Sequence, residues 1–339
     1  MAQSTRIAVI GGGIIGLSSA VRIIETTPGV KVTVIAEKLT PETTGDGSAG
    51  FWYPYLLGEV SAAEIRFWCE NTFNFLKDIY KSSEASDHGI GLLSAFFLHD
   101  EPLEKPTYSD IYFQWRALND KELALFPSHY KYGVFVTTLY AECCKLLPML
   151  MKRLQSKGGQ IVKRKLKSIE ELSDKFDIVI NCPGVGAAKL VPDPSVVPIR
   201  GQVIRVRAPW IKHAVMAGDD FYILPNSEEV ICGGTHQEGN WSTKVDPSDR
   251  DKIWQGCTEI IPSLKKAKIV REWVGLRPGR PKPRLERETM KTKNGILEVI
   301  HNYGHGGSGV TLFWGCAIRT TELLQDVLAE RRKNVRANL

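Results

Sequence analysis

The chain has 339 residues, of which 43% are hydrophobic and 24% charged, close to the average for a globular protein. This length suits two lobes better than one small core, and the composition excludes wholesale disorder and fibrous repeats. The 44 lysines and arginines exceed the 38 aspartates and glutamates by only six and are dispersed, so we expect no nucleic-acid binding. The longest nearly apolar run, residues 7–17, is far shorter than the roughly 20 residues of a membrane span, so we expect no membrane segment.

The cysteines and histidines predict neither a disulfide framework nor a metal site. The seven cysteines contain no C-x-x-C pair, and an odd, scattered set is typical of a reducing compartment in which thiols act as small core residues. The seven histidines lack the spacing from a cysteine or carboxylate that metal ligands need. We therefore expect no bound metal.

The chain begins with the pattern of a buried strand that enters a glycine-rich turn. Residues 6–10 are, after Arg6, apolar and mostly β-branched without alternation, as in a parallel strand covered on both faces. Gly11, Gly13 and Gly16 follow as G-x-G-x-x-G. In this motif the first glycine permits the turn, the second lets a pyrophosphate approach the backbone, and the third lets the next helix pack on the strand.

A helix and a second strand complete this unit. Residues 14–26 have helical apolar spacing, and the apolar run 31–36 ends directly at Glu37, 21 residues after Gly16. The helix N-terminus offers unpaired N–H groups and a positive dipole end to phosphates, and Glu37 can accept hydrogen bonds from ribose hydroxyls. Because an acid at this position disfavours a 2′-phosphate, the unit predicts FAD or NAD rather than NADP.

The segments that follow favour FAD over NAD. A polar loop carries Thr43 and Thr44, whose hydroxyls can reach a pyrophosphate, and turns aromatic at Phe51. Further along come two helical patterns and another buried strand, at 62–80, 120–125 and 176–184. A nucleotide domain that is interrupted and resumed is typical of a discontinuous FAD domain.

The strongest pattern lies near the C-terminus. Residues 299–317 place five glycines among aromatic and hydroxyl residues and continue into a predicted helix over 318–328. Glycines at a helix entrance create a pocket rich in N–H groups, suited to an electron-rich ring carbonyl of a flavin. The stretch resembles the signature of the D-amino-acid oxidase and D-aspartate oxidase family at two apolar residues, His301, Asn302, Tyr303, Gly304, Gly306, Gly307, Gly309, Gly315 and Ala317. Other landmarks in family order extend the resemblance over nearly the whole chain: Thr43-Thr44, Trp52-x-Pro54-Tyr55, Arg200-Gly201-Gln202 and Leu276-Arg277-Pro278.

The resemblance implies an α/β fold and a reaction. We expect a doubly wound, Rossmann-like FAD-binding domain, discontinuous in sequence, and a second substrate domain with a mixed or antiparallel sheet. The first would comprise 1–55, 140–195 and 285–339, and the second 56–139 and 196–284. Family members hold FAD non-covalently and oxidise a D-amino acid by hydride transfer to the flavin. The product hydrolyses to a 2-oxo acid and ammonia, and O2 takes up the electrons as hydrogen peroxide.

The resemblance also assigns the substrate anchors. Arg277 matches the carboxylate ligand, a role that suits its planar guanidinium; the alternative is a structural ion pair with Glu286 or Glu288. Tyr222 matches a tyrosine whose hydroxyl contacts the same carboxylate, and its alternative is an ordinary strand residue. Gly307 matches the position whose carbonyl accepts a hydrogen bond from the substrate amine. With both groups held, one enantiomer alone directs its Cα–H at the flavin, and we expect no obligatory side-chain base.

The glycine-rich turns and the family motifs together define the expected FAD contacts. They are Gly11, Gly13, Ile14, Ile15, Gly16, Glu37, Lys38, Thr43, Thr44, Ala49, Gly50, Phe51, Cys182, Gly184, Gly306, Gly307, Ser308, Gly309, Val310 and Thr311.

The residues expected around the substrate favour neutral or basic D-amino acids over D-aspartate. An acidic substrate needs additional arginines, whereas the lid segment 215–220 is apolar and then acidic. His236 stands where the acidic-substrate enzymes would have arginine, and an uncharged imidazole attracts a second carboxylate little. Asp219 and Asp220 would oppose that carboxylate if they face the pocket, and Tyr53 is expected on its wall. D-Aspartate oxidase is the alternative function.

Three other functions explain less of the sequence. An NAD-dependent dehydrogenase leaves the C-terminal glycines without a role. An amine or glycine oxidase fits the C-terminal signature less well, and a non-catalytic flavin-binding protein would not need Arg277 and Tyr222.

The resemblance and the C-terminal residues predict partners and a location. Homodimerisation is a family expectation. Ala337-Asn338-Leu339 resembles a degenerate S-K-L address, which predicts binding to the peroxisomal import receptor and a place in the peroxisomal matrix, with the cytoplasm as the alternative.

Overall fold

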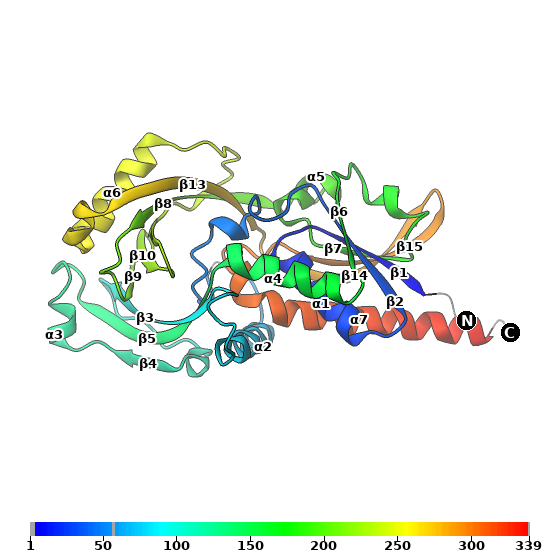
Figure 1. Cartoon of the computed structure of the whole chain (residues 1–339), viewed down its shortest axis with the longest axis horizontal. Coiled ribbons are helices and arrows are strands. Elements are labelled where there is room, and N and C mark those ends of the chain that lie inside the picture. The colour runs from blue at the N-terminus through cyan, green and yellow to red at the C-terminus, as the bar shows by residue number, and fades with distance from the viewer. Residues whose placement is uncertain (1–3, 56–57, 338–339) are drawn as a thin grey trace.

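In the computed structural model the described residues are 4–55 and 58–337, with 334–337 described by backbone alone. Asn338 and Leu339 of the predicted targeting tripeptide lie outside them. Within these residues the chain forms two lobes, each built on one sheet, with both chain ends at the far end of one lobe (Figure 1).

The lobe that holds the chain ends is built on a six-stranded sheet. Its order is β14-β15-β7-β1-β2-β6, and every neighbouring pair is parallel except β14 with β15. The bounds are β1 Thr5–Ile10, β2 Val30–Ala36, β6 Gln160–Lys163, β7 Ile178–Asn181, β14 Arg284–Thr292 and β15 Gly295–Tyr303. Helices α1 (Ile14–Thr26), α4 (Cys143–Ser156) and α7 (Gly309–Ala337) pack together beside it. The predicted α/β nucleotide-binding fold, assembled from separated segments, is confirmed.

The second lobe is built on a nine-stranded mixed sheet. Its order is β12-β8-β11-β10-β9-β3-β5-β4, with β13 also paired to β8, and β3 with β9 is its parallel pair. The bounds are β3 Ile90–His99, β4 Gln114–Ala117, β5 Tyr132–Ala141, β8 Val197–Arg207, β9 Ala214–Ala217, β10 Phe221–Pro225, β11 Val230–Gly233, β12 Gln237–Glu238 and β13 Lys268–Gly279. The remaining α-helices are α2 (Ala62–Tyr80), α3 (Asp120–Leu123), α5 (Ala187–Leu190) and α6 (Pro247–Ile260). This confirms the predicted mixed sheet.

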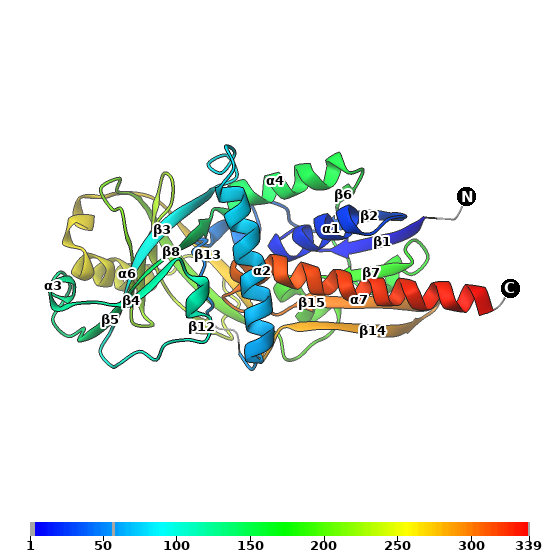
Figure 2. The ribbon, with the colours of Figure 1, turned by 90° about the horizontal axis from the view of Figure 1, so that it is seen from below.

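Helix α2 crosses α7 where the two lobes meet (Figure 2). The Ser61 hydroxyl caps α2 by accepting from the Glu64 N–H. Trp68, Cys69, Thr72, Phe73 and Leu76 form its buried face. This packing ties the first strands of the second lobe to the nucleotide-binding lobe.

The C-terminal helix begins earlier than predicted. It starts at Gly309 rather than at residue 318, so Gly315 lies inside it. A Cβ at Gly315 would overlap the backbone of Trp68, and the Gly315 N–H donates to the Thr72 hydroxyl at 3.0 Å. A glycine inside a helix costs about 1 kcal/mol relative to alanine, and here it permits close packing of α7 on α2.

The sequence predicts neither a membrane span nor a metal site. In the described part of the chain, no helix combines the length and apolar character needed to cross a membrane. Within the same residues, no group of three or more His, Cys, Asp or Glu side chains is arranged to hold a metal ion.

Candidate active site

A cavity of about 920 Å3 lies between the two lobes and is lined by residues of both. It extends from Glu37, at the end of β2, past the glycine-rich turn after β1, to Arg277 on β13. The predicted substrate contacts Tyr53, Tyr222, His236, Arg277 and Gly307 all line it. So do all the predicted cofactor contacts except Ser308, even though they come from six separate stretches of the chain.

Ser308 is the predicted cofactor contact that does not line the cavity. Its side chain is buried outside the cavity lining, where the hydroxyl accepts from the Tyr55 N–H at 2.6 Å and donates to the Tyr55 carbonyl. Thr311 makes the equivalent contact by donating to the Tyr53 carbonyl at 2.9 Å. The two hydroxyls therefore fasten the aromatic segment 53–55 to the start of α7.

The turn after β1 forms a cradle with one open face. Gly11 has a φ of +107°, and a Cβ there would overlap the Cys182 carbonyl oxygen. A Cβ at Gly16 would overlap the Gly11 carbonyl oxygen, so both glycines are required by backbone packing. Gly13 is different, because a Cβ there would meet nothing within 4 Å. Its open face lies in the cavity at the N-terminus of α1, which fits the pyrophosphate of a dinucleotide such as FAD.

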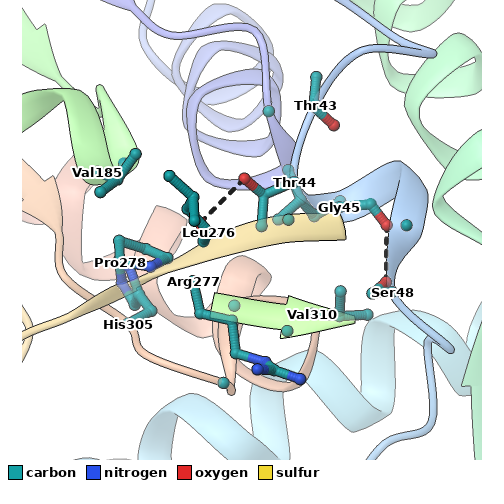
Figure 3. A pocket seen from close by; sticks show the side chains of 18 of the residues that line it. Thr43, Thr44, Gly45, Ser48, Val185, Leu276, Arg277, Pro278, His305 and Val310 are labelled. Atoms are coloured by element: carbon teal, nitrogen blue, oxygen red, sulfur yellow. Dashed lines mark hydrogen bonds between the residues drawn. The ribbon is translucent and has the colours of Figure 1, made fainter. Parts of the chain in front are cut away.

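The polar residues predicted to contact the cofactor also have partners within the protein. Glu37 is half exposed and accepts from the Lys165 ammonium at 2.7 Å. The Thr43 hydroxyl donates to Asp46 at 2.6 Å, and Thr44 donates to the Leu276 carbonyl at 3.2 Å (Figure 3). Both threonine hydroxyls thus help to fix the loop that borders the cavity.

Arg205, on β8, holds the same loop from the other lobe and was not predicted. Its side chain is 7% exposed, and its guanidinium donates to the carbonyls of Asp46, Gly47 and Ser48 at 3.4, 3.4 and 3.2 Å. No local sequence pattern could identify this contact, because it joins segments more than 150 residues apart.

The C-terminal glycine cluster is joined to the strand that carries Arg277. The Gly306 N–H donates to the Pro278 carbonyl at 2.8 Å. Between Gly304 and Gly306, both of positive φ, lies His305. Burial lowers the pKa of His305 to about 4, so its imidazole is uncharged at neutral pH. Its Nε2 is buried and has no partner among the described residues, and its ring borders the cavity beside Pro278 (Figure 3).

Arg277 extends from β13 into the cavity (Figure 3). Its Nη1 donates to the Thr235 carbonyl at 2.9 Å, and it forms no ion pair with any described carboxylate. The nearby glutamates are occupied elsewhere, because Glu286 and Glu288 both pair with Arg284. The structural ion pair considered as an alternative for Arg277 is therefore excluded.

Tyr222 lies close to Arg277 on the cavity wall. It is paired with Gly233 in the β10–β11 ladder, and a Cβ at Gly233 or Gly234 would crowd its ring. Burial raises the pKa of Tyr222, and the charge of Arg277 opposes that rise. The hydroxyl therefore stays protonated, and it shares the cavity with a cation that has no carboxylate partner.

The rest of the wall is aromatic and was only partly predicted. Tyr53 stacks on Tyr55 with ring centroids 6.1 Å apart and meets Phe97 edge-on at 5.0 Å. Tyr55, His99 and Asp219 also line the cavity but were not among the predicted contacts. The sequence did contain a signal for Asp219, since an acidic pair ends the predicted lid.

The fold and the cavity define a flavin-dependent oxidoreductase, and comparison with known proteins gives the family. A model of the FAD dependent oxidoreductase family, DAO, matches residues 6–323. The chain is 43% identical to a D-amino acid oxidase of Dugesia ryukyuensis, over 96% of this chain and 99% of that one. It is 38% identical to a D-aspartate oxidase of Homo sapiens, over 96% of each chain. The chain belongs to this FAD-dependent family of D-amino-acid and D-aspartate oxidases, and an NAD-dependent dehydrogenase is excluded.

Solved structures share the fold. Glycine oxidase from Bacillus cereus ATCC 14579 superposes with a TM-score of 0.74 at 17% identity, covering 95% of each chain. Glycine oxidase from Geobacillus kaustophilus gives the same TM-score at 18% identity. At this identity the likeness concerns the fold alone.

Proposed function

We propose that the protein catalyses the FAD-dependent oxidative deamination of D-amino acids, with neutral or basic side chains preferred. One D-amino acid, one O2 and one water give one 2-oxo acid, one ammonia and one hydrogen peroxide. The observation that carries the proposal is the Arg277 guanidinium, which has no carboxylate partner and lines the same cavity as the glycine cradle.

The chain's own residues would bind and orient the substrate. Bound FAD supplies the electron acceptor for the oxidation. Arg277 would hold the substrate carboxylate through a bidentate, charge-assisted contact, and the Tyr222 hydroxyl would donate to the same group. The Gly307 carbonyl would accept from the amine. Fixing both groups leaves one enantiomer with its Cα–H toward the cofactor, so selectivity for D-amino acids follows from positioning.

The same proposal assigns the FAD contacts. Gly13 and the N-terminus of α1 would receive the pyrophosphate, and Glu37 would accept from the ribose hydroxyls. His305 would offer its unpartnered imidazole to the cofactor from the C-terminal glycine cluster. The other predicted residues lining the cavity would make non-covalent contacts along its length.

The lining of the cavity favours neutral and basic substrates over D-aspartate. Apart from Arg277, the basic side chains that border the described cavity near Tyr222 are the imidazoles of His99 and His236. A second carboxylate would therefore meet no additional arginine and would face Asp219. D-Aspartate oxidase remains the competing function, because one relative carries that name.

Further proposals concern the whole chain. We assign 1–55, 140–195 and 285–339 to the FAD domain and 56–139 and 196–284 to the substrate domain, a division that sheet membership supports.

We also propose that the protein forms a homodimer, which light scattering would check. For location we propose the peroxisomal matrix, with the cytoplasm as the alternative; an N-terminally tagged chain should leave the peroxisome when residues 337–339 are deleted.

The experiment that tests the activity is a balance of products. FAD-loaded protein is mixed with D-methionine in air, and O2 uptake, hydrogen peroxide, ammonia and 2-oxo acid are measured. We expect equal amounts of all four and no turnover of L-methionine. Bound FAD without any of these products from any D-amino acid would support the non-catalytic alternative.

A further inference from the structure

Asp219 occupies a defined place on the substrate cavity. It lies in the turn between β9 and β10, whose register pairs Ala217 with Phe221 and Met216 with Tyr222. The turn is held in place because the Gly218 N–H donates to the Leu98 carbonyl at 2.8 Å. Asp219 therefore stands three residues before Tyr222, with the two Cα atoms at most about 10 Å apart. An extended lysine or arginine side chain can span a distance of that order.

The two carboxylates of this turn differ in their surroundings. Asp219 lines the cavity and forms no ion pair with any described residue. Asp220 does not line the cavity, and its carboxylate lies 3.7 Å from the Lys252 ammonium. Both residues are exposed, and Asp219 alone of the two belongs to the cavity lining.

The groups that face Asp219 do not neutralise it. His99 ends β3 beside the turn, and burial lowers its pKa, so the imidazole is uncharged at neutral pH. Its Nε2 is buried and has no partner among the described residues. Burial raises the pKa of Tyr53 and of Tyr55, and the charge of Asp219 raises both further.

The charge of Asp219 and that of Arg277 act on the same region of the cavity. Arg277 lowers the pKa of Tyr55 while Asp219 raises it, so the Tyr55 hydroxyl senses both charges. The cavity lysines, Lys38, Lys165, Lys167 and Lys189, follow strands of the nucleotide-binding sheet or belong to α5, so they border its other part. The substrate part is therefore positive at Arg277 and negative at Asp219.

We propose that Asp219 is a specificity-determining residue that binds the cationic end of the substrate side chain and selects D-arginine and D-lysine over neutral D-amino acids of similar length. The proposal rests on the function proposed above. The aromatic rings of Tyr53, Tyr55 and Phe97 would cover the methylene groups of such a side chain. The same carboxylate would repel the second carboxylate of D-aspartate.

Binding without turnover tests this directly. FAD-loaded protein is titrated with 5-guanidinopentanoate and with heptanoate, which carry the carboxylate but lack the α-amine and cannot be deaminated. We expect the guanidino acid to bind more tightly, and Asp219→Asn to weaken its binding about 3- to 10-fold while leaving heptanoate unchanged. Asp220→Asn is the matched control and should leave the ratio of the two dissociation constants as in the wild type.

Turnover gives a second readout. Asp219→Asn should lower kcat/KM for D-arginine by a similar factor and leave D-norleucine unchanged. The role of Asp219 would be overturned if Asp219→Asn and Asp220→Asn changed the ratio of the two dissociation constants equally. It would also be overturned if neither variant changed that ratio. Selective binding of the guanidino acid without oxidation of any D-amino acid would instead overturn the proposed function and leave the binding site in place.

Discussion

Arg277 donates to the carbonyl of Thr235 at 2.9 Å and has no carboxylate partner in the described chain. The next three arginines along the chain are all paired: Arg280 with Asp193, Arg284 with Glu286 and Glu288, and Arg287 with Glu298 and Glu330. A guanidinium left unpaired in a cavity is available to an anionic ligand. This contrast between neighbouring arginines supports the assignment of Arg277 as the substrate anchor.

Arg277→Lys should impair the enzyme without loss of FAD. Lysine keeps the charge but cannot bind a carboxylate in bidentate fashion. A hydrogen bond to a charged group contributes about 1.5–3 kcal/mol, so kcat/KM for D-methionine should fall roughly 10- to 150-fold. Steady-state kinetics and the flavin absorbance of the purified variant check this. The exposed Arg319→Lys is the control, and equal kcat/KM in both variants would rule out the anchor role.

Tyr222→Phe should have a smaller effect, chiefly on KM. The variant keeps the ring that packs on Gly233 and removes the hydroxyl alone. Because the net value of one hydrogen bond is about 0.5–1.5 kcal/mol, KM for D-methionine should rise roughly 2- to 12-fold. An unchanged KM would show that the hydroxyl does not contact the substrate.

Gly13→Ala should weaken FAD binding without destabilising the apoprotein. A methyl group at Gly13 meets no protein atom within 4 Å and would occupy the space proposed for the pyrophosphate. We expect the dissociation constant for FAD, measured by titrating the apoprotein, to rise about tenfold or more, which is about 1.4 kcal/mol. An unchanged constant would place the pyrophosphate elsewhere.

Gly315→Ala, in contrast to Gly13→Ala, should destabilise the apoprotein. Its methyl group would overlap the backbone of Trp68 and force α7 away from α2, so we expect the free energy of unfolding of the apoprotein to fall by about 1–3 kcal/mol. Gly186→Ala is the control, because its Cβ would lie 3.6 Å from Pro183, an ordinary contact, in a helical conformation. Equal stability of the two variants by chemical denaturation would contradict the packing argument.

His305 should make the stability of the apoprotein depend on pH. Burial lowers the pKa of His305 from 6.5 to about 4, so between these values the unfolded chain binds more protons than the folded one. The contribution of the uncharged His305 to the free energy of unfolding is complete above pH 6.5. As the pH falls toward 4, about 3 kcal/mol of this free energy is lost. His305→Gln should remove this part of the pH dependence of unfolding, whereas the exposed His213→Gln should retain it.

Local spacing predicted the elements that rest on local chemistry. The turn at Gly11 to Gly16, helix α1 and the strand that ends at Glu37 follow from apolar periodicity and glycine positions, and their bounds agree with the structure to within a residue. The start of α7 was missed, because the glycine cluster indicates a loop unless the contact of Gly315 with Trp68 is known. At the start of α7, tertiary packing outweighs the low helix propensity of glycine.

The contacts that assemble the site could not be predicted in the same way. Thr44 donates to Leu276, Ser308 binds Tyr55, and Arg205 reaches a loop of the other lobe. Each joins segments that are distant in sequence, and hydroxyl and guanidinium groups are compatible with many partners. The sequence therefore indicated which residues gather in the cavity better than it indicated how they are held.

The central claim is that the cavity orients a D-amino acid against FAD by its carboxylate and amine. Its most direct test is anaerobic mixing of the FAD-loaded protein with D- and L-enantiomers of methionine, alanine, arginine and aspartate, followed at the visible absorbance of the flavin. The account predicts rapid bleaching by the D-enantiomers of the neutral and basic amino acids and none by the L-enantiomers. Bleaching by D-aspartate alone would contradict the substrate preference, and bleaching by neither enantiomer of any of them would contradict the enzyme itself.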